Sequence, residues 1–134
     1  PLFAKAGAII PTAINNTSAN TFSGDSLKIS YFVSSQASER TFYFDDGKDP
    51  TAIKDNQHEL LKSSVDVENG VFSFELRREG YYAGSPISRS IFWEVVGLKK
   101  KPTVLPEGAD WDERTKVLTY QLELEKEATW AVKK

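Results

Sequence analysis

The sequence lacks cysteine and methionine entirely, and its 134 residues include one histidine. Without cysteine there is no disulfide framework and no thiolate site, so redox chemistry gives no information about the compartment. The single histidine, His58, excludes a histidine-rich zinc site. No Gly-x-Ser-x-Gly turn is present to support a hydrolase triad, which favours a surface histidine over a catalytic one. The glycines are dispersed among turns, so no phosphate loop and no cofactor site are predicted.

An excess of charge of either sign is also missing. The 17 basic and 19 acidic side chains give a formal charge of -2. A balance so close to neutral lacks the basic field that nucleic acid or an anionic membrane would need as a partner. No apolar run is long enough to span a bilayer. We therefore expect neither nucleic acid nor a membrane as a partner.

The chain starts at Pro1 and has no Met, which predicts that it is a piece of a longer polypeptide. Its length suits one domain large enough to bury a core without disulfides or metals. A signal peptide would belong to the missing upstream part, so the sequence leaves the localisation open.

Period-two alternation of apolar and polar residues is what the sequence does contain. It predicts strands over residues 27–33, 40–45, 58–67, 71–77, 90–96, 117–125 and 127–133, with a bent strand in 1–11 and a short one at 103–105. Residues 13–26, 78–89 and 107–113 are predicted connections. Residues 40–45 carry aromatics on both faces, which indicates that both are covered. The pattern predicts an all-β fold, an antiparallel β-sandwich of about eight short strands.

Two turns stand out between these strands. Asn69-Gly70 predicts a hairpin, because both residues tolerate the positive φ angles of a two-residue turn. Asp46-Gly47 predicts another tight reversal, with the aspartate bonding the backbone beyond it. Asp45 and Asp46 project to opposite faces of an extended strand, so they do not form the carboxylate pair of a glycosidase. A metal site at Asp45, Asp46 and Asp49 is the alternative to a structural turn.

Three aromatic residues lie in predicted loops. They are Tyr81, Tyr82 and Trp111. Exposed rings at these positions would stack on the faces of sugars, whereas buried rings would cover the open ends of the sandwich. The second interpretation is favoured, because loop aromatics usually fold back onto the core.

Two segments also resemble a known family. Residues 1–11, Pro-Leu-Phe-Ala-Lys-Ala-Gly-Ala-Ile-Ile-Pro, are similar to the segment that follows the catalytic barrel in glycoside hydrolase family 31, the α-glucosidase and α-xylosidase family. Tyr43-Phe44-Asp45-Asp46-Gly47 resembles the Tyr-x-Asp-Asp-Gly turn that opens the distal carboxy-terminal β-sandwich of that family. The order of later segments also fits: residues 80–84, Arg89 entering the strand 90–97, and residues 102–104.

The resemblance implies a domain division. Residues 1–25 would be the tail of the preceding proximal β-sandwich with a linker, and residues 26–134 the distal C-terminal β-sandwich. It also implies that the catalytic barrel and the proximal sandwich of the same parent chain are the partners. The segment that carries the family's aspartate nucleophile does not occur in these residues, so no catalytic residue is carried over. A periplasmic or extracellular location would follow from the family alone.

These observations support a main hypothesis and two alternatives. The main one is a non-catalytic accessory domain of an α-glycosidase that stabilises or positions the barrel. The first alternative is a carbohydrate-binding module that contacts an α-glucan oligosaccharide through Tyr81, Tyr82 and Trp111. A free-standing adhesion domain of immunoglobulin-like type fits the strands equally well, because a fold does not assign a function.

Overall fold

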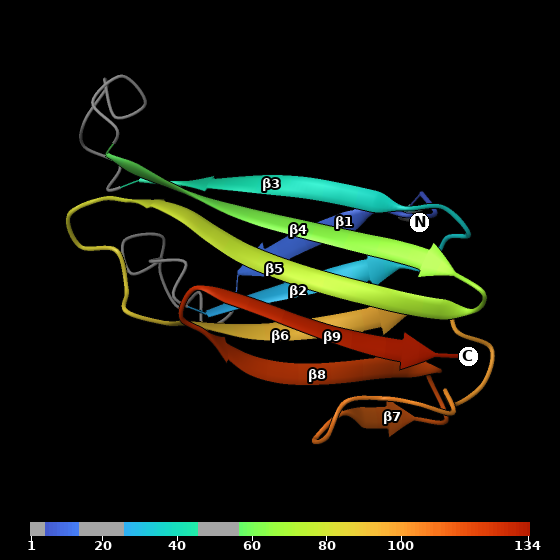
Figure 1. Ribbon diagram of the computed structural model, residues 1–134. Helices are drawn as coiled ribbons and strands as arrows, with labels where there is room; N and C mark the ends of the chain where they lie inside the picture. Colours follow the sequence, from blue (N-terminus) through green and yellow to red (C-terminus); the bar gives the residue numbers. More distant parts are fainter. Residues whose placement is uncertain (1–4, 14–25, 46–56) are drawn as a thin grey trace.

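Two β-sheets packed face to face make up the molecule (Figure 1). The computed structural model describes residues 5–13, 26–45 and 57–134. In this part of the chain the strands are β1 (Ile9–Ala13), β2 (Ser26–Phe32), β3 (Ser38–Phe44), β4 (His58–Glu68), β5 (Val71–Tyr81), β6 (Arg89–Val96), β7 (Asp110–Asp112), β8 (Val117–Leu124) and β9 (Glu127–Lys133). The five-stranded sheet has the order β1-β2-β6-β8-β7, and the four-stranded sheet has the order β3-β4-β5-β9. The prediction of an all-β sandwich is confirmed.

One pair of strands departs from the antiparallel rule. β2 and β6 run parallel, whereas the other paired strands are antiparallel. The chain leaves the five-stranded sheet after β2, forms β3 to β5 in the opposite sheet, and returns with β6 beside β2 (Figure 1). Each neighbour of this parallel pair is again antiparallel, so the sandwich is antiparallel in its main part. No helix in the described residues is long and apolar enough to cross a membrane.

The core lies between the two sheets and is rich in aromatic rings. Trp93 of β6 contacts Phe74 of β5 and Trp130 of β9 edge-on, with ring centroids 5.3 and 5.4 Å apart. Tyr31 of β2 meets Phe74 in the same way at 5.6 Å. Edge-to-face packing of this kind adds to the stabilisation that comes from buried area. The alternating residues that predict the strands therefore supply the two inner faces.

The hairpin between β4 and β5 has the predicted turn residues at its tip. Asn69 and Gly70 have φ angles of 52° and 78°, and Glu68 pairs with Val71 on either side of them. Two consecutive positive φ angles match the right-handed twist of the flanking strands.

Three of the predicted segments differ from the structure in their bounds or in their secondary structure. β5 continues to Tyr81 where a connection was expected from Arg78, because Arg78 to Tyr81 pair with Leu61 to His58 of β4. Residues 110–112 form β7 at the edge of β8 instead of a loop. Residues 103–105 contribute only an isolated bridge between Val104 and Lys133.

The first described strand belongs to the sandwich. β1 covers residues 9–13, so the strand predicted within 1–11 lies later in the chain, and it pairs with β2 at the edge of the five-stranded sheet. Pro11 is tolerated there because an edge strand leaves one of its sides without ladder hydrogen bonds. Ile9 is buried in the common core. The division of the chain at residue 25 stays a prediction.

Candidate functional site

A cluster of buried charges closes one end of the sandwich. Glu59 lies near the start of β4, Arg78 near the end of β5, and Arg89 at the start of β6. Each occupies an inward position of its strand, two residues beyond an apolar core residue. Glu59 is 1% exposed and Arg89 is fully buried. Charged side chains are almost never buried in this way unless they are paired, so their partners decide what the cluster does.

Arg89 is enclosed by three groups of different chemistry. Its Nε donates to Glu59 Oε2 at 2.8 Å, and its Nη2 donates to the hydroxyl of Tyr82 at 3.2 Å. The guanidinium carbon lies 4.1 Å from the centre of the Phe44 ring. A guanidinium plane suits this combination of a carboxylate at its edge and an aromatic ring at its face.

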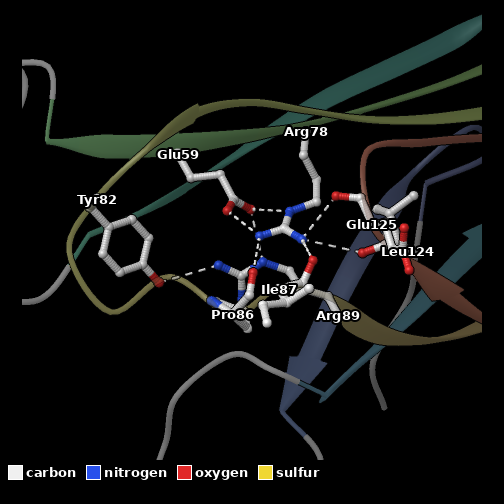
Figure 2. Close-up of polar contacts among 8 residues, drawn as sticks. All are labelled: Glu59, Arg78, Tyr82, Pro86, Ile87, Arg89, Leu124 and Glu125. Atoms are coloured by element: carbon white, nitrogen blue, oxygen red, sulfur yellow. Dashed lines mark hydrogen bonds and ion pairs between the residues drawn. The ribbon is translucent and has the colours of Figure 1, made fainter.

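Arg78 connects the cluster to the backbone. Its Nη2 lies 2.7 Å from Glu59 Oε1 and also donates to the carbonyl of Pro86 at 2.7 Å. Its Nη1 donates to three further carbonyls, those of Ile87, Leu124 and Glu125. Figure 2 shows the Arg78 side chain between the Glu59 carboxylate and these carbonyl groups. Because β5 belongs to one sheet and Leu124 ends β8 of the other, Arg78 ties the two sheets and the connection before β6 together.

The Glu59 carboxylate stays ionised in this setting. Burial by itself raises the pKa of Glu59, but hydrogen bonds from Arg78 and Arg89 and their positive charges together outweigh it, so the pKa lies below its ordinary value. A carboxylate that two guanidinium groups already saturate has little capacity to carry a proton. The cluster is therefore suited to fixing the segment from Tyr82 to Ser88 against the sandwich.

Two large side chains beside the cluster, one at the end of β5 and one in the fixed segment, are exposed to solvent. Tyr81 is 63% exposed and Ile87 is 91% exposed, and a hollow of about 540 Å³ beside them is lined by both residues together with Arg78 and Lys126. Exposed apolar side chains are informative when they gather at one place on a fold. This end of the sandwich thus combines a hydrogen-bonded base with an exposed rim formed by Tyr81 and Ile87.

The three predicted stacking residues do not form one platform. Tyr82 is 6% exposed and its hydroxyl accepts from Arg89, so its ring belongs to the buried cluster. Tyr81 is exposed at the end of β5, in the four-stranded sheet. Trp111 is half-buried in β7 at the edge of the other sheet, and its Nε1 donates to Glu113 Oε2 at 2.7 Å. In Figure 1 the end of β5 and β7 lie at opposite ends of the molecule.

The aspartate turn lies largely outside the described residues. Asp45 is described, whereas Asp46, Gly47 and Asp49 fall between the described ranges 26–45 and 57–134. Asp45 Oδ2 accepts from the Tyr43 hydroxyl at 2.9 Å. The described residues contain no group of three or more acidic or histidine side chains placed to hold a metal ion. The metal site at Asp45, Asp46 and Asp49 stays an untested alternative.

His58 and Tyr43 form a stacked pair on the outer face of the four-stranded sheet. Their ring centroids are 5.4 Å apart with an interplanar angle of 20°. Tyr43 is 43% exposed, so the expectation that both faces of residues 40–45 are covered is wrong: Phe42 faces the core and Tyr43 faces out. The half-buried His58 lies at the start of β4, opposite Tyr81.

Sequence reasoning missed the charged cluster. The period-two pattern carries the signal: Glu59 precedes Leu61, Ser63 and Val65 on one face of β4. In the same way Arg78 follows Leu76 and Arg89 precedes Ile91. Extending each alternation by one step would place three charged residues inside the sandwich at a common end.

Comparison with known proteins gives matches in structure but not in sequence. No protein-family model and no curated protein sequence matches the chain. A GH31 dextranase from Flavobacterium johnsoniae matches 97% of this chain with a TM-score of 0.76 and 18% identity. An α-1,4-glucan lyase from Gracilariopsis lemaneiformis matches 94% with a TM-score of 0.66 and 17% identity. A GH31 α-xylosidase from Xanthomonas citri matches 92% with a TM-score of 0.61 and 18% identity.

The chain has the fold of a domain in family 31 glycoside hydrolases. It spans 19% of the dextranase, 16% of the lyase and 12% of the α-xylosidase. The shared part is therefore one small region of each much longer enzyme, and the match concerns the fold of that region.

Proposed function

We propose that this chain is a non-catalytic C-terminal accessory β-sandwich of an α-glycosidase related to family 31, in which it stabilises or positions the catalytic barrel. The observation that carries the proposal is the structural match over nearly the whole chain to a small part of three carbohydrate-active enzymes. In this proposal residues 26–134 are the distal domain, and residues 1–25 are the end of a proximal sandwich with its linker. The barrel and that proximal sandwich, both in the same parent chain, are its partners.

The chemistry of the described residues supports an accessory role. Glycosidases need two carboxyl groups on either side of the scissile bond, at separations of roughly 5–10 Å. Glu59, the buried carboxylate, is saturated by Arg78 and Arg89 instead of facing a cleft. The exposed rim at Tyr81 and Ile87 offers an apolar surface for packing against another domain.

Two measurements test this proposal. The purified chain should release no product from an aryl α-glucoside or from dextran, and turnover that persists through repeated purification would overturn it. The coding region upstream of the Pro1 codon should encode, in frame, the rest of the proximal sandwich and, before it, a barrel domain. A stop codon or an unrelated module there would favour the free-standing adhesion domain instead.

The exposure of Tyr81 favours a second function, a carbohydrate-binding module. A ring that is 63% exposed has a free face for a sugar, whereas Tyr82 does not. Under this alternative Tyr81→Ala weakens binding of a malto-oligosaccharide and Trp111→Ala does so independently, because the two residues lie in different sheets. Unchanged binding by both variants would exclude a contribution of Tyr81 and Trp111 to sugar binding.

A further inference from the structure

The outer face of the five-stranded sheet carries an ordered set of polar side chains around one aromatic ring. The pairing registers put these residues in two rows: Lys28, Phe92 and Gln121 in the first, and Ser30, Glu94, Thr119 and Asp110 in the second. Successive residues of a strand point to opposite faces, and the neighbours Ile91 and Trp93 face the core. The two rows therefore lie side by side across β2, β6, β8 and β7 on the face away from the core.

Six of these seven residues, all except Ser30, line a groove of about 580 Å³. Lys28 and Phe92 lie on its lining, and it is also bordered by Gly108, just before β7, and by Asp110, the first residue of β7. Small-molecule sites in proteins typically measure about 300–1,000 Å³ and combine apolar surface with a few placed polar groups. The groove has both the size and the composition of such a site.

Two of the three charged side chains that line the groove, Lys28 and Glu94, compensate each other. Lys28 Nζ lies 3.1 Å from Glu94 Oε2, and the Ser30 hydroxyl donates to Glu94 Oε1 at 3.2 Å. Both oxygens of Glu94 are thus held in place, and Asp110 adds a further negative charge at the border. Without an excess of positive charge the groove does not suit a phosphate or another anion. The polar groups that line the groove are better matched to a neutral ligand with many hydroxyl groups.

Such a ligand needs an apolar face and a ring of hydrogen-bond groups. The half-buried Phe92 provides a flat apolar surface for the C–H face of a pyranose ring. Gln121 and Thr119, both exposed beside it on β8, supply donors and acceptors for hydroxyl groups. Lys28 and Glu94 add a fixed donor and a fixed acceptor across the groove.

We propose that this groove binds a neutral oligosaccharide, with Phe92 stacking on a sugar ring and with Gln121 and Thr119 bonding its hydroxyl groups. The site is distinct from Tyr81 and from Trp111, neither of which lines the groove. Its assignment rests on the groove itself. Only the choice of an α-glucan as the first probe rests on the proposed function.

The test is an NMR titration of the ¹⁵N-labelled chain with maltohexaose and isomaltotriose, at ligand concentrations on the order of 5 mM to detect a millimolar Kd. We expect amide shifts grouped on the strands that line the groove. Phe92→Ala should weaken binding by ~10-fold or more. Because this variant removes a half-buried ring, Gln121→Ala and Thr119→Ala at exposed positions provide a second test, each with a loss of ~3-fold or more. Ser73→Ala, at an exposed position of β5 in the other sheet, is the matched control and should bind as the unaltered chain does.

The outcomes separate this inference from the proposed function. Cellohexaose that binds at the same residues when the α-linked sugars do not would support the groove and count against an α-glycosidase parent. Shifts that gather at Tyr81, which does not line the groove, would overturn the inference. No shift with any of the three sugars would also overturn it, while leaving the accessory role in place.

Discussion

Arg89 Nε lies 2.8 Å from Glu59 Oε2, in an ion pair whose side chains are 0% and 1% exposed. Glu59 belongs to β4 of the four-stranded sheet and Arg89 to β6 of the five-stranded sheet, so the pair joins the two layers. Arg78 completes the cluster and holds the carbonyls of the segment before β6. The end of the sandwich is thus closed by charge instead of by apolar side chains, which makes its stability unusually sensitive to Glu59.

Replacing Glu59, the carboxylate that Arg78 and Arg89 share, should lower the free energy of unfolding. Glu59→Gln leaves Arg78 and Arg89 without their counter-charge, and breaking a buried ion pair from one side costs about 3–5 kcal/mol. We expect this loss in the free energy of unfolding from urea denaturation. Glu79→Gln is the matched control, since Glu79 pairs with Lys62 on the exposed face. It should leave the urea midpoint nearly unchanged, and an equal effect of both substitutions would contradict the cluster.

Because Glu59 is ionised in the folded chain, we also expect the fold to lose stability in acid. The pKa of Glu59 in the folded chain lies below its ordinary value, because the two arginines outweigh the effect of burial. Its contribution is therefore present above the unfolded pKa of about 4.3 and is lost as the pH falls through the folded pKa. Thermal midpoints measured from pH 7 to pH 3 should fall less steeply for Glu59→Gln than for the unaltered chain. Parallel curves for the two would exclude Glu59 as the titrating group.

Two neighbouring tyrosines should respond differently to the loss of a hydroxyl. Tyr82→Phe removes the partner of Arg89 Nη2 and should cost about 0.5–1.5 kcal/mol in the free energy of unfolding. Tyr81→Phe changes a side chain that is 63% exposed and should have little effect. Chemical denaturation of both variants measures the difference. A larger effect at Tyr81 would show that the loop is placed differently.

Alanine substitutions at two glycines with similar φ angles distinguish backbone strain from a steric clash. Gly80 and Gly84 have φ angles of +86° and +94°. A Cβ at Gly80 would lie 2.5 Å from the His58 carbonyl oxygen. A Cβ at Gly84 would have no atom of the described residues within 4 Å, apart from its own neighbours in the chain. Both alanine variants carry the backbone cost of about 1–2 kcal/mol. Gly80→Ala should lose at least ~2 kcal/mol more, because β4 and β5 must move apart. Equal unfolding free energies for the two variants would count against the pairing of Gly80 with Glu59.

Much of the fold could be predicted from the sequence because its strands alternate. The alternation in residues 27–33 and 90–96 reports directly on the inner faces of β2 and β6, and Asn69-Gly70 marks the hairpin. The parallel pairing of β2 with β6 could not be predicted, since it depends on where the chain returns after β5. β7 was missed because three residues are too few to show a period.

The charged cluster was missed for a different reason. A hydrophobic pattern ends where charged residues begin, so Arg78 and Arg89 marked strand ends in the sequence although both lie on inner faces. Their burial depends on Glu59, which is 19 residues from Arg78 and 30 from Arg89. The outer groove is likewise assembled from four strands that only the register aligns. Both features come from tertiary contacts between distant segments.

Deletion of residues 26–134 from the parent enzyme tests the central claim most directly. An accessory sandwich that stabilises the barrel predicts a lower thermal midpoint for the truncated enzyme, with kcat on an aryl α-glucoside retained at temperatures where it stays folded. Addition of the purified chain in trans should raise the midpoint again if the domain packs on the barrel. Loss of kcat in a truncated enzyme that is still folded would contradict the account, because it would show that this domain takes part in catalysis.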